Sequence, residues 1–344
     1  MDRHQAEQIY PKGTISIGLV HEALMAAYSQ GLNTTAILQQ AGISNELLQS
    51  AKARLPVSMY AELWIALADA MNDEFFGMDS HPMRRGSYQL LAKLLIQSEN
   101  LQKALQDCCR FMNLILDDIR AELSIDDEQA YLTLHDRQGP KRMFSYATYI
   151  MLVHGLMCWL TEQRVVLKQM SVRCKQPKEI EDYRVRFCQN IEFNATENRI
   201  TFDAQYLQLK IKKDKKSLYE FLQQTPHNLL VRYKNPNSLS LQLRRQLMER
   251  SPEYWPELGE IAEQQHMSEA TLQRRLKHEN TSYQQLKNDI RRDIAIERLS
   301  KSQDSIQDIS DALSFHDPSA FHRAFKKWTG VSPGAYRQLQ QTPD

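Results

Sequence analysis

Two copies of one helical pattern in the C-terminal third constrain the fold more than any other feature of this chain. Residues 257–280 and 304–330 each begin with a segment whose apolar residues recur every three or four positions, which is the spacing of one buried helix face. After a polar turn, each copy continues into a second helical segment with a basic side. Ala270 and Ala320 occupy equivalent places, 50 residues apart. The repetition predicts two helix-turn-helix units, although either copy alone also fits a helix pair in a bundle.

The second helix of each unit has its own start or stop signals. Ser268 is a predicted N-cap, and Asp317 followed by Pro318 is typical of a cap and a first helical position. Gly330 predicts the end of the later helix. Each helix has an apolar side and a polar side. The polar sides hold Ala270, Gln273, Arg274 and Lys277 in the first unit, and Ser319, Ala320, Arg323, Lys326 and Lys327 in the second.

A single helix over residues 282–299 is predicted between the two units. Its length would be about 27 Å at the usual rise per residue. Successive major-groove segments on one face of DNA lie about 34 Å apart. A linker helix of this length is therefore expected to hold the two second helices near that separation.

The net charge of +1 is unevenly distributed along the chain. Residues 1–209 carry −4, residues 210–239 carry +5, and residues 240–344 are neutral. The basic run Leu209–Ser217 fits a solvated helix end or linker, and the alternative is a segment that attracts phosphate. Because the C-terminal part has no bulk positive charge, DNA binding by it must depend on where its charges lie.

The front of the chain is predicted to be one α+β domain over residues 1–205. A basic linker region over residues 206–239 and an all-α domain over residues 240–344 would follow it. Apolar spacing predicts helices over residues 15–29, 57–71, 88–96, 101–116 and 143–163. Alternating or short apolar segments predict strands over residues 119–125, 130–135, 167–174 and 198–202.

Several classes of protein are disfavoured by what the sequence lacks. The five cysteines are odd in number and none has CxxC spacing, which favours reduced cytosolic thiols over disulfides or a zinc site. No uninterrupted apolar run reaches the length of a membrane span, and no secretory signal begins the chain. Phosphate-loop, dinucleotide, zinc-protease and hydrolase motifs are absent. We therefore expect a cytoplasmic non-enzyme without cofactor, metal or catalytic residues; the alternative is a thiol-dependent enzyme fused to a DNA-binding part.

The stretch Ile306–Arg337 closely resembles the signature of the AraC/XylS family of bacterial transcription regulators. The first unit resembles the family more loosely. Two residues depart from the pattern: Ser314 and Asn280 stand where the family usually has glycine. The matching positions are Ile309 to Ala312, Phe315, Ser319, Phe321, Arg323, Phe325 to Lys327, Gly330, Pro333, Tyr336 and Arg337.

The front half is similar to the effector-binding and dimerisation domain of the ornithine-utilisation-type branch of this family. The matches are scattered over the segments AILQQAGIS, SENLQKALQDCCRFM and FCQNIEFNATENRITFDAQYL, together with Phe76-Gly77 and Gln176-Pro177. The resemblance implies an α+β effector-binding and dimerisation domain, followed by an all-α domain with two helix-turn-helix units on a long linker helix.

The resemblance also implies a role for each polar side chain of the two second helices. By position, the base-reading residues would be Ala270, Gln273, Arg274, Ser319, Ala320 and Arg323. Arginine can bond guanine, glutamine can bond adenine, and alanine can contact the thymine methyl group. Lys277, Lys326 and Lys327 better suit phosphates, because lysine is a mobile point charge. His278 and His322 fit either a DNA contact or simple exposure.

The partners implied are double-stranded DNA, a small-molecule effector of unknown identity and a second copy of the chain, with RNA polymerase as a further candidate and no membrane. The effector pocket would draw on Phe144, Tyr149 and His154, for which plain core is the alternative. Arg84 and Arg85 would hold a carboxylate, or form a solvated turn. A second hypothesis keeps DNA binding but replaces the effector with a protein partner or with constitutive activity.

Overall fold

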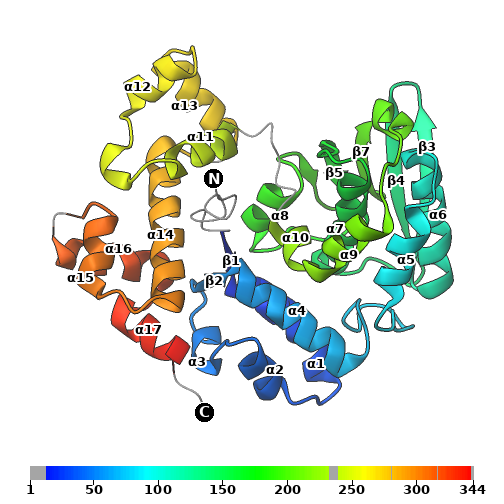
Figure 1. Cartoon of the computed structure of the whole chain (residues 1–344), viewed down its shortest axis with the longest axis horizontal. Helices are drawn as coiled ribbons and strands as arrows, with labels where there is room; N and C mark the ends of the chain where they lie inside the picture. The colour runs from blue at the N-terminus through cyan, green and yellow to red at the C-terminus, as the bar shows by residue number, and fades with distance from the viewer. Residues whose placement is uncertain (1–12, 232–238, 280, 316, 342–344) are drawn as a thin grey trace. The chain divides into compact units, whose positions relative to one another are not determined.

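The computed structural model describes residues 13–231, 239–279, 281–315 and 317–341, and it forms two compact units. The helical unit takes its described residues from Met1–Ile17, Ser44–Ser58 and Pro236–Asp344. The sheet unit consists of Gly18–Ile43 and Met59–Asn235. The chain therefore passes between the units more than once, and two short pieces from the front of the sequence belong to the helical unit (Figure 1).

A five-stranded sheet in the order β3-β4-β7-β5-β6 forms the centre of the sheet unit. Neighbouring strands are antiparallel except for the parallel pair of β5 and β6. Leu132 in β4 lies opposite both Leu123 in β3 and Ile200 in β7, which fixes the register across three strands. The strands are β3 (Ile119–Asp126), β4 (Gln129–Asp136), β5 (Leu167–Ser171), β6 (Ile191–Glu192) and β7 (Asn198–Asp203).

Helix α7 (Met143–Leu160), which has no polar face, lies in the core of the sheet unit. All 18 of its residues are buried. Among the described helices, α7 alone is long and apolar enough to cross a membrane, but here it is enclosed by protein. Trp159 stacks on Phe221 of α9 (Lys215–Gln223) at 4.3 Å between ring centroids, and the Tyr88 hydroxyl donates to the Leu152 carbonyl.

Further helices complete the sheet unit. Residues 206–239 were predicted to be a basic linker, but they contain two helices, α9 and α10. Helix α9 begins within the charge run because the Asp214 side chain caps it. The helices are α1 (Ile17–Ser29, with Ile17 itself in the helical unit), α2 (Thr34–Gln40), α4 (Val57–Met71), α5 (Ser87–Leu95), α6 (Leu101–Ile115), α8 (Ile180–Arg186), the 3-10 turn η1 (Ala204–Gln208), α9 (Lys215–Gln223) and α10 (His227–Val231).

The helical unit joins seven C-terminal helices to a small piece of the front of the chain. Its strands β1 (Thr14–Ser16) and β2 (Arg54–Pro56) pair antiparallel, with Ile15 opposite Leu55. We predicted that the helix would begin at residue 15, but strand pairing delays its start to Ile17. The other elements are α3 (Asn45–Leu48), α11 (Leu239–Met248), η2 (Pro252–Tyr254), α12 (Leu258–Gln264), α13 (Glu269–His278), α14 (Tyr283–Lys301), α15 (Ile306–Ala312), α16 (Pro318–Thr329) and α17 (Pro333–Gln341).

Candidate nucleic-acid interface

The two predicted helix-turn-helix units are present as α12–α13 and α15–α16, and their turns have the same backbone. His266 and Ser314 each lie two residues beyond the leading helix with positive φ, 53° and 56°. The next amide donates back to Ala262 at 2.9 Å in one turn and to Ser310 at 3.1 Å in the other. This is the Schellman ending, which needs a left-handed residue. It accounts for the glycine usual at the position of Ser314; Asn280, the other departure, lies outside the described residues.

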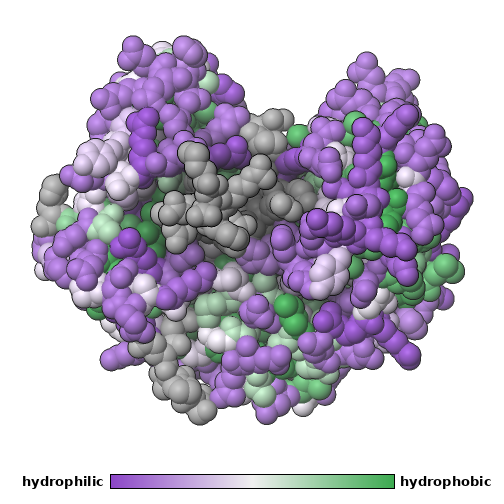
Figure 2. Space-filling view, viewed as in Figure 1, coloured by the Kyte–Doolittle hydropathy of each residue, from purple (hydrophilic) through white to green (hydrophobic). Residues whose placement is uncertain are grey.

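Helix α13 begins at the predicted cap. The Ser268 hydroxyl oxygen accepts from the Thr271 amide at 3.2 Å. Leu272 and Leu276 are fully buried in a hydrophobic core together with Ile261. The opposite side is exposed, and Figure 2 shows a predominantly hydrophilic surface over α12 and α13. The exposed residues of α13 include Ala270, Gln273, Arg274, Lys277 and His278.

Helix α16 is fixed at both ends. The Asp317 carboxylate accepts from the Ser319 amide at 2.9 Å, and this bond lowers the pKa of Asp317. Gly330 ends the helix with a φ of 83°. Phe321 and Phe325 are fully buried, whereas Trp328, expected in the same stripe, is half-buried. Ser319, His322, Arg323, Lys326 and Lys327 are exposed, and Ala320 is half-buried.

The two arginines expected to read bases are free to meet a ligand. Arg274 makes no hydrogen bond or ion pair with the described residues. Arg323 lies 3.8 Å from Asp317, and its side chain is 74% exposed. An exposed pair at this distance is weak. Both guanidinium groups are therefore available to DNA.

Helix α14 runs between the two units, as predicted for the linker helix (Figure 1). Its Arg291 lies over the Trp255 ring at 5.0 Å and over the Phe315 ring at 5.7 Å, and donates to the Leu313 carbonyl at 3.0 Å. Trp255 belongs to the core of the first unit, and Phe315 lies in the turn of the second. Burial lowers the pKa of Arg291. One side chain thus ties both units to the linker.

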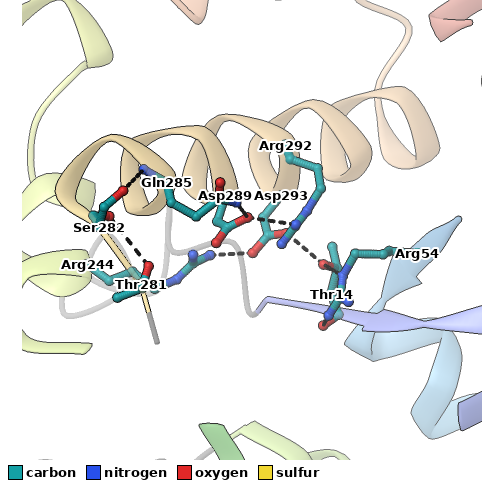
Figure 3. A network of polar contacts seen from close by, with 9 residues as sticks. All are labelled: Thr14, Arg54, Arg244, Thr281, Ser282, Gln285, Asp289, Arg292 and Asp293. Carbon is teal, nitrogen blue, oxygen red and sulfur yellow. Dashed lines mark hydrogen bonds and ion pairs between the residues drawn. The ribbon is translucent and has the colours of Figure 1, made fainter. Parts of the chain in front are cut away.

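A buried carboxylate at Asp293 attaches the front strands to α14 (Figure 3). It accepts from the Thr14 hydroxyl at 2.6 Å and from Arg244 and Arg292. Arg54 in turn donates to the Thr14 hydroxyl and carbonyl, both at 2.8 Å. Burial alone would raise the pKa of Asp293, but the three arginines outweigh it and hold the pKa below the ordinary value.

The second helix-turn-helix unit is also attached to the segment between α3 and β2. The Ser50 hydroxyl donates to the Thr329 carbonyl at 2.9 Å, and the buried Tyr336 hydroxyl donates to the Arg54 carbonyl at 2.8 Å. A Cβ atom on Gly330 would come within 2.7 Å of the Ser50 oxygen. A piece of the front sequence therefore packs closely against the end of α16.

The five residues predicted to form an effector pocket are not brought together. Phe144 lines one cavity and Arg85 another, while Arg84 is exposed. Tyr149 and His154 are fully buried in the core. His154 bonds the Val165 carbonyl at 2.7 Å, and burial together with Arg186 and Arg164 lowers its pKa. The continuous apolar character of α7 could not show which side chains face a cavity.

The thiols have the character of core residues. Cys108, Cys109, Cys158 and Cys188 are buried. Burial raises the pKa of Cys109 to about 12 and that of Cys158 to about 11. Since the thiolate is the nucleophile, such residues are poor reaction centres. Among the described residues, no group of three or more potential ligands has the arrangement of a metal site.

Comparison with known proteins gives matches for both parts of the chain. Residues 31–211, more than half of the sequence, match the arabinose-binding domain of AraC transcription regulators, and residues 261–339 match a helix-turn-helix domain. The chain belongs to the AraC family of transcription regulators. It is a DNA-binding regulator with an arabinose-binding-type N-terminal domain, and the predicted family and fold class are confirmed.

Relatives of this AraC-family chain are themselves transcription regulators. The ornithine utilization regulator of Pseudomonas aeruginosa is 25% identical over 318 residues, covering 92% of this chain and 93% of that protein. The regulator VqsM of the same organism is 35% identical over 86 residues, 25% of this chain and 26% of that protein. The virulence regulon activator VirF of Shigella flexneri is 33% identical over 89 residues, 26% of this chain and 34% of that protein.

Two connecting residues of the AraC-type helical unit escaped prediction from sequence. Asp293 lies three residues after Ile290 and three before Ile296, so it falls on the apolar side of α14. A carboxylate in that stripe was the available signal for a buried ion pair. Arg291 gave no such signal, because its two ring partners are far apart in the sequence.

Proposed function

We propose that this regulator reads two successive major-groove segments of one DNA duplex, one with α13 and the other with α16. The observation that carries the proposal is the repeated turn, because His266 and Ser314 give both units the same helix ending and each following helix has an exposed arginine. The linker helix α14 has 19 residues, about 28 Å at the usual rise per residue. This length suits neighbouring groove segments.

The roles within each helix follow from side-chain chemistry. In α13, Arg274, Gln273 and Ala270 would contact bases, and in α16, Arg323, Ser319 and Ala320 would do so. The exposed Lys277, Lys326 and Lys327 would contact phosphates, which position the protein without reading sequence. Acidic residues elsewhere in the unit offset these charges, so the positive surface expected to contact DNA is confined to these two helices.

Selection from a random-sequence DNA pool tests this proposal. The full-length protein should enrich two short sequence elements with centres about 10 base pairs apart, one helical turn. Arg274→Ala should relax preference within one element and Arg323→Ala within the other, each at a cost of about 1–3 kcal/mol in specific binding. Lys326→Ala should weaken binding to all sequences alike and reduce its salt dependence.

Arg275→Ala is the matched control. This exposed arginine also lies on α13, but it donates to the Met267 sulfur and is not among the residues expected to read bases. It should leave both elements intact. Enrichment of a single element, or loss of the same element in both arginine variants, would contradict the two-helix proposal.

We further propose an effector-responsive homodimer with the predicted domains 1–205, 206–239 and 240–344, acting in the cytoplasm and contacting RNA polymerase. The arabinose-binding-type match over residues 31–211 supports a ligand-sensing role. Leu90 and Leu94 on α5 and Leu114 on α6 are exposed apolar side chains, and they would contact the second copy. Light scattering of wild type and of Leu90→Gln tests the dimer. Control by a protein partner is the alternative to an effector.

A further inference from the structure

A cavity of about 480 Å³ in the sheet unit is lined by an unusual excess of basic side chains. Its wall comes from the start of α7, the loop before it, the segments after β5 and β6, α8 and α1. Pockets of this size suit metabolite-sized ligands. The basic lining residues are Lys141, Arg142, Arg173 and Lys175, and Glu22 is the one acidic residue among the described residues of the lining.

Two of the four cations are held in place from behind. Lys141 pairs with Asp118 at 2.7 Å, and Arg173 pairs with Asp136 at 3.0 Å. The side chains of Asp118 and Asp136 are 8% and 0% exposed, so both carboxylates are buried behind the lining. The bond from Lys141 lowers the pKa of Asp118. These pairs fix the cations at the cavity wall without filling it.

The other donors of the cavity are free or held by a single group. Arg142 pairs with Glu22 of α1. Lys175 is exposed and pairs with none of the described residues. Tyr183 is only 5% exposed, and its hydroxyl has no hydrogen-bond partner among the described residues. This hydroxyl is therefore available as a donor to a ligand.

The start of α7 adds a further attraction for negative charge. Arg142 is the N-cap of this 18-residue helix, no side chain caps it, and no acidic residue lies in its first turn. The amides of a helix start carry partial positive charge. Met143 and Phe144 line the cavity beside them and supply an apolar wall.

We propose that this cavity binds a small organic anion, whose carboxylate or phosphate oxygens replace Glu22 on Arg142 and engage Lys175 and Tyr183. Every polar group named here except Glu22 either donates hydrogen bonds or carries positive charge. Glu22 therefore occupies the position of a ligand oxygen. The inference deepens the proposed effector response and rests on it. It also gives a route along the chain: Glu22 lies on α1, which directly follows β1, and Thr14 of β1 bonds Asp293 on α14.

The test measures binding of citrate, succinate and inorganic phosphate to the full chain by calorimetry, at constant ionic strength, with uncharged erythritol as the control. At least one anion should bind saturably. Lys175→Gln should weaken it about tenfold, the size expected for a charged hydrogen bond. Glu22→Gln should tighten it severalfold, because the internal competitor is removed. Lys178→Gln, an exposed lysine outside the cavity, is the matched control and should change nothing.

The outcomes separate this inference from the proposed function. Absence of saturable binding by all three anions, or equal effects of Lys175→Gln and Lys178→Gln, would overturn the anion site while leaving DNA selection intact. Failure of DNA selection with normal anion binding would instead overturn the two-helix proposal. A ligand effect on DNA affinity that is lost in Lys175→Gln and retained in Lys178→Gln would support both.

Discussion

The two helix-turn-helix units share one backbone design but differ in how they are held. The first has a mostly aliphatic core built by Leu272, Leu276 and their neighbours from α11, α12 and α14, with Trp255 and Tyr283 as its aromatic members. The second has an aromatic core around Phe321 and Phe325, and it is also bonded to the front segment through Ser50 and Tyr336. In the described residues, the corresponding link of the first unit is indirect, through Arg244 and Asp293.

Because of this difference, the two units are expected to respond differently to changes at the front of the chain. The second unit is joined to residues that continue into α4, and the first is joined to them through the linker helix. A change in the front segment is therefore expected to act on the second unit first. The three predictions below test that comparison, beginning with the buried carboxylate that joins the linker helix to the front strands.

Replacement of Asp293 should have the largest effect. Asp293→Asn leaves Arg244, Arg292 and Arg54 without their buried carboxylate, and we expect a loss of about 3–5 kcal/mol in the free energy of unfolding at pH 7. The folded pKa lies below the ordinary value, so the ionised group stabilises above about pH 3.9 and its contribution declines as the pH falls further. Urea unfolding at several pH values measures this difference.

Asp289→Asn is the control for this experiment. Asp289 pairs with the same Arg292 at 2.8 Å, but its side chain is 29% exposed. It should cost less than about 1 kcal/mol. Equal losses in the two variants would show that the buried position of Asp293 is not what matters.

Removal of the Tyr336 hydroxyl should have a moderate effect limited to the second unit. Tyr336→Phe deletes the bond to the Arg54 carbonyl, and we expect a loss of about 1 kcal/mol. Tyr254→Phe in the first unit changes a residue that is 68% exposed and should be neutral. Hydrogen exchange should show faster opening of residues 44–58 in Tyr336→Phe alone. Unchanged exchange there would contradict direct attachment of this segment to the second unit.

Glycine in the two turns should have the smallest effect, and the same effect in both units. His266→Gly and Ser314→Gly each relieve a left-handed residue and should stabilise by about 0.5–1 kcal/mol, because glycine adopts positive φ without steric cost. Thermal unfolding measures the gain. Stabilisation in one variant and destabilisation in the other would contradict the equivalence of the two turns.

Much of the local structure was predictable because its signals lie close together in the sequence. The caps at Ser268 and Asp317 and the stop at Gly330 were predicted and are confirmed. The linker helix was expected over residues 282–299 and is Tyr283–Lys301. Strand β1 and helix α3 were missed, because three or four residues carry too little periodicity to identify an element.

The residues expected to form the effector pocket could not be predicted correctly from the sequence. Tyr149 and His154 share a helix with Phe144, yet they point into the core while Phe144 borders a cavity. Helix α7 is apolar on every side, so its sequence has no face to distinguish. The basic residues that line the cavity come from separate loops and were not grouped by sequence reasoning.

The sequence by itself determined the repeated helix pairs, their exposed arginines and the family, because capping, periodicity and spacing act over a few residues. Tertiary structure alone decided that Thr14 would meet both Arg54 and Asp293, and that Lys141, Arg173 and Lys175 would surround one cavity. Contacts between residues far apart in the chain depend on how whole elements pack, and packing leaves no periodic trace in the sequence.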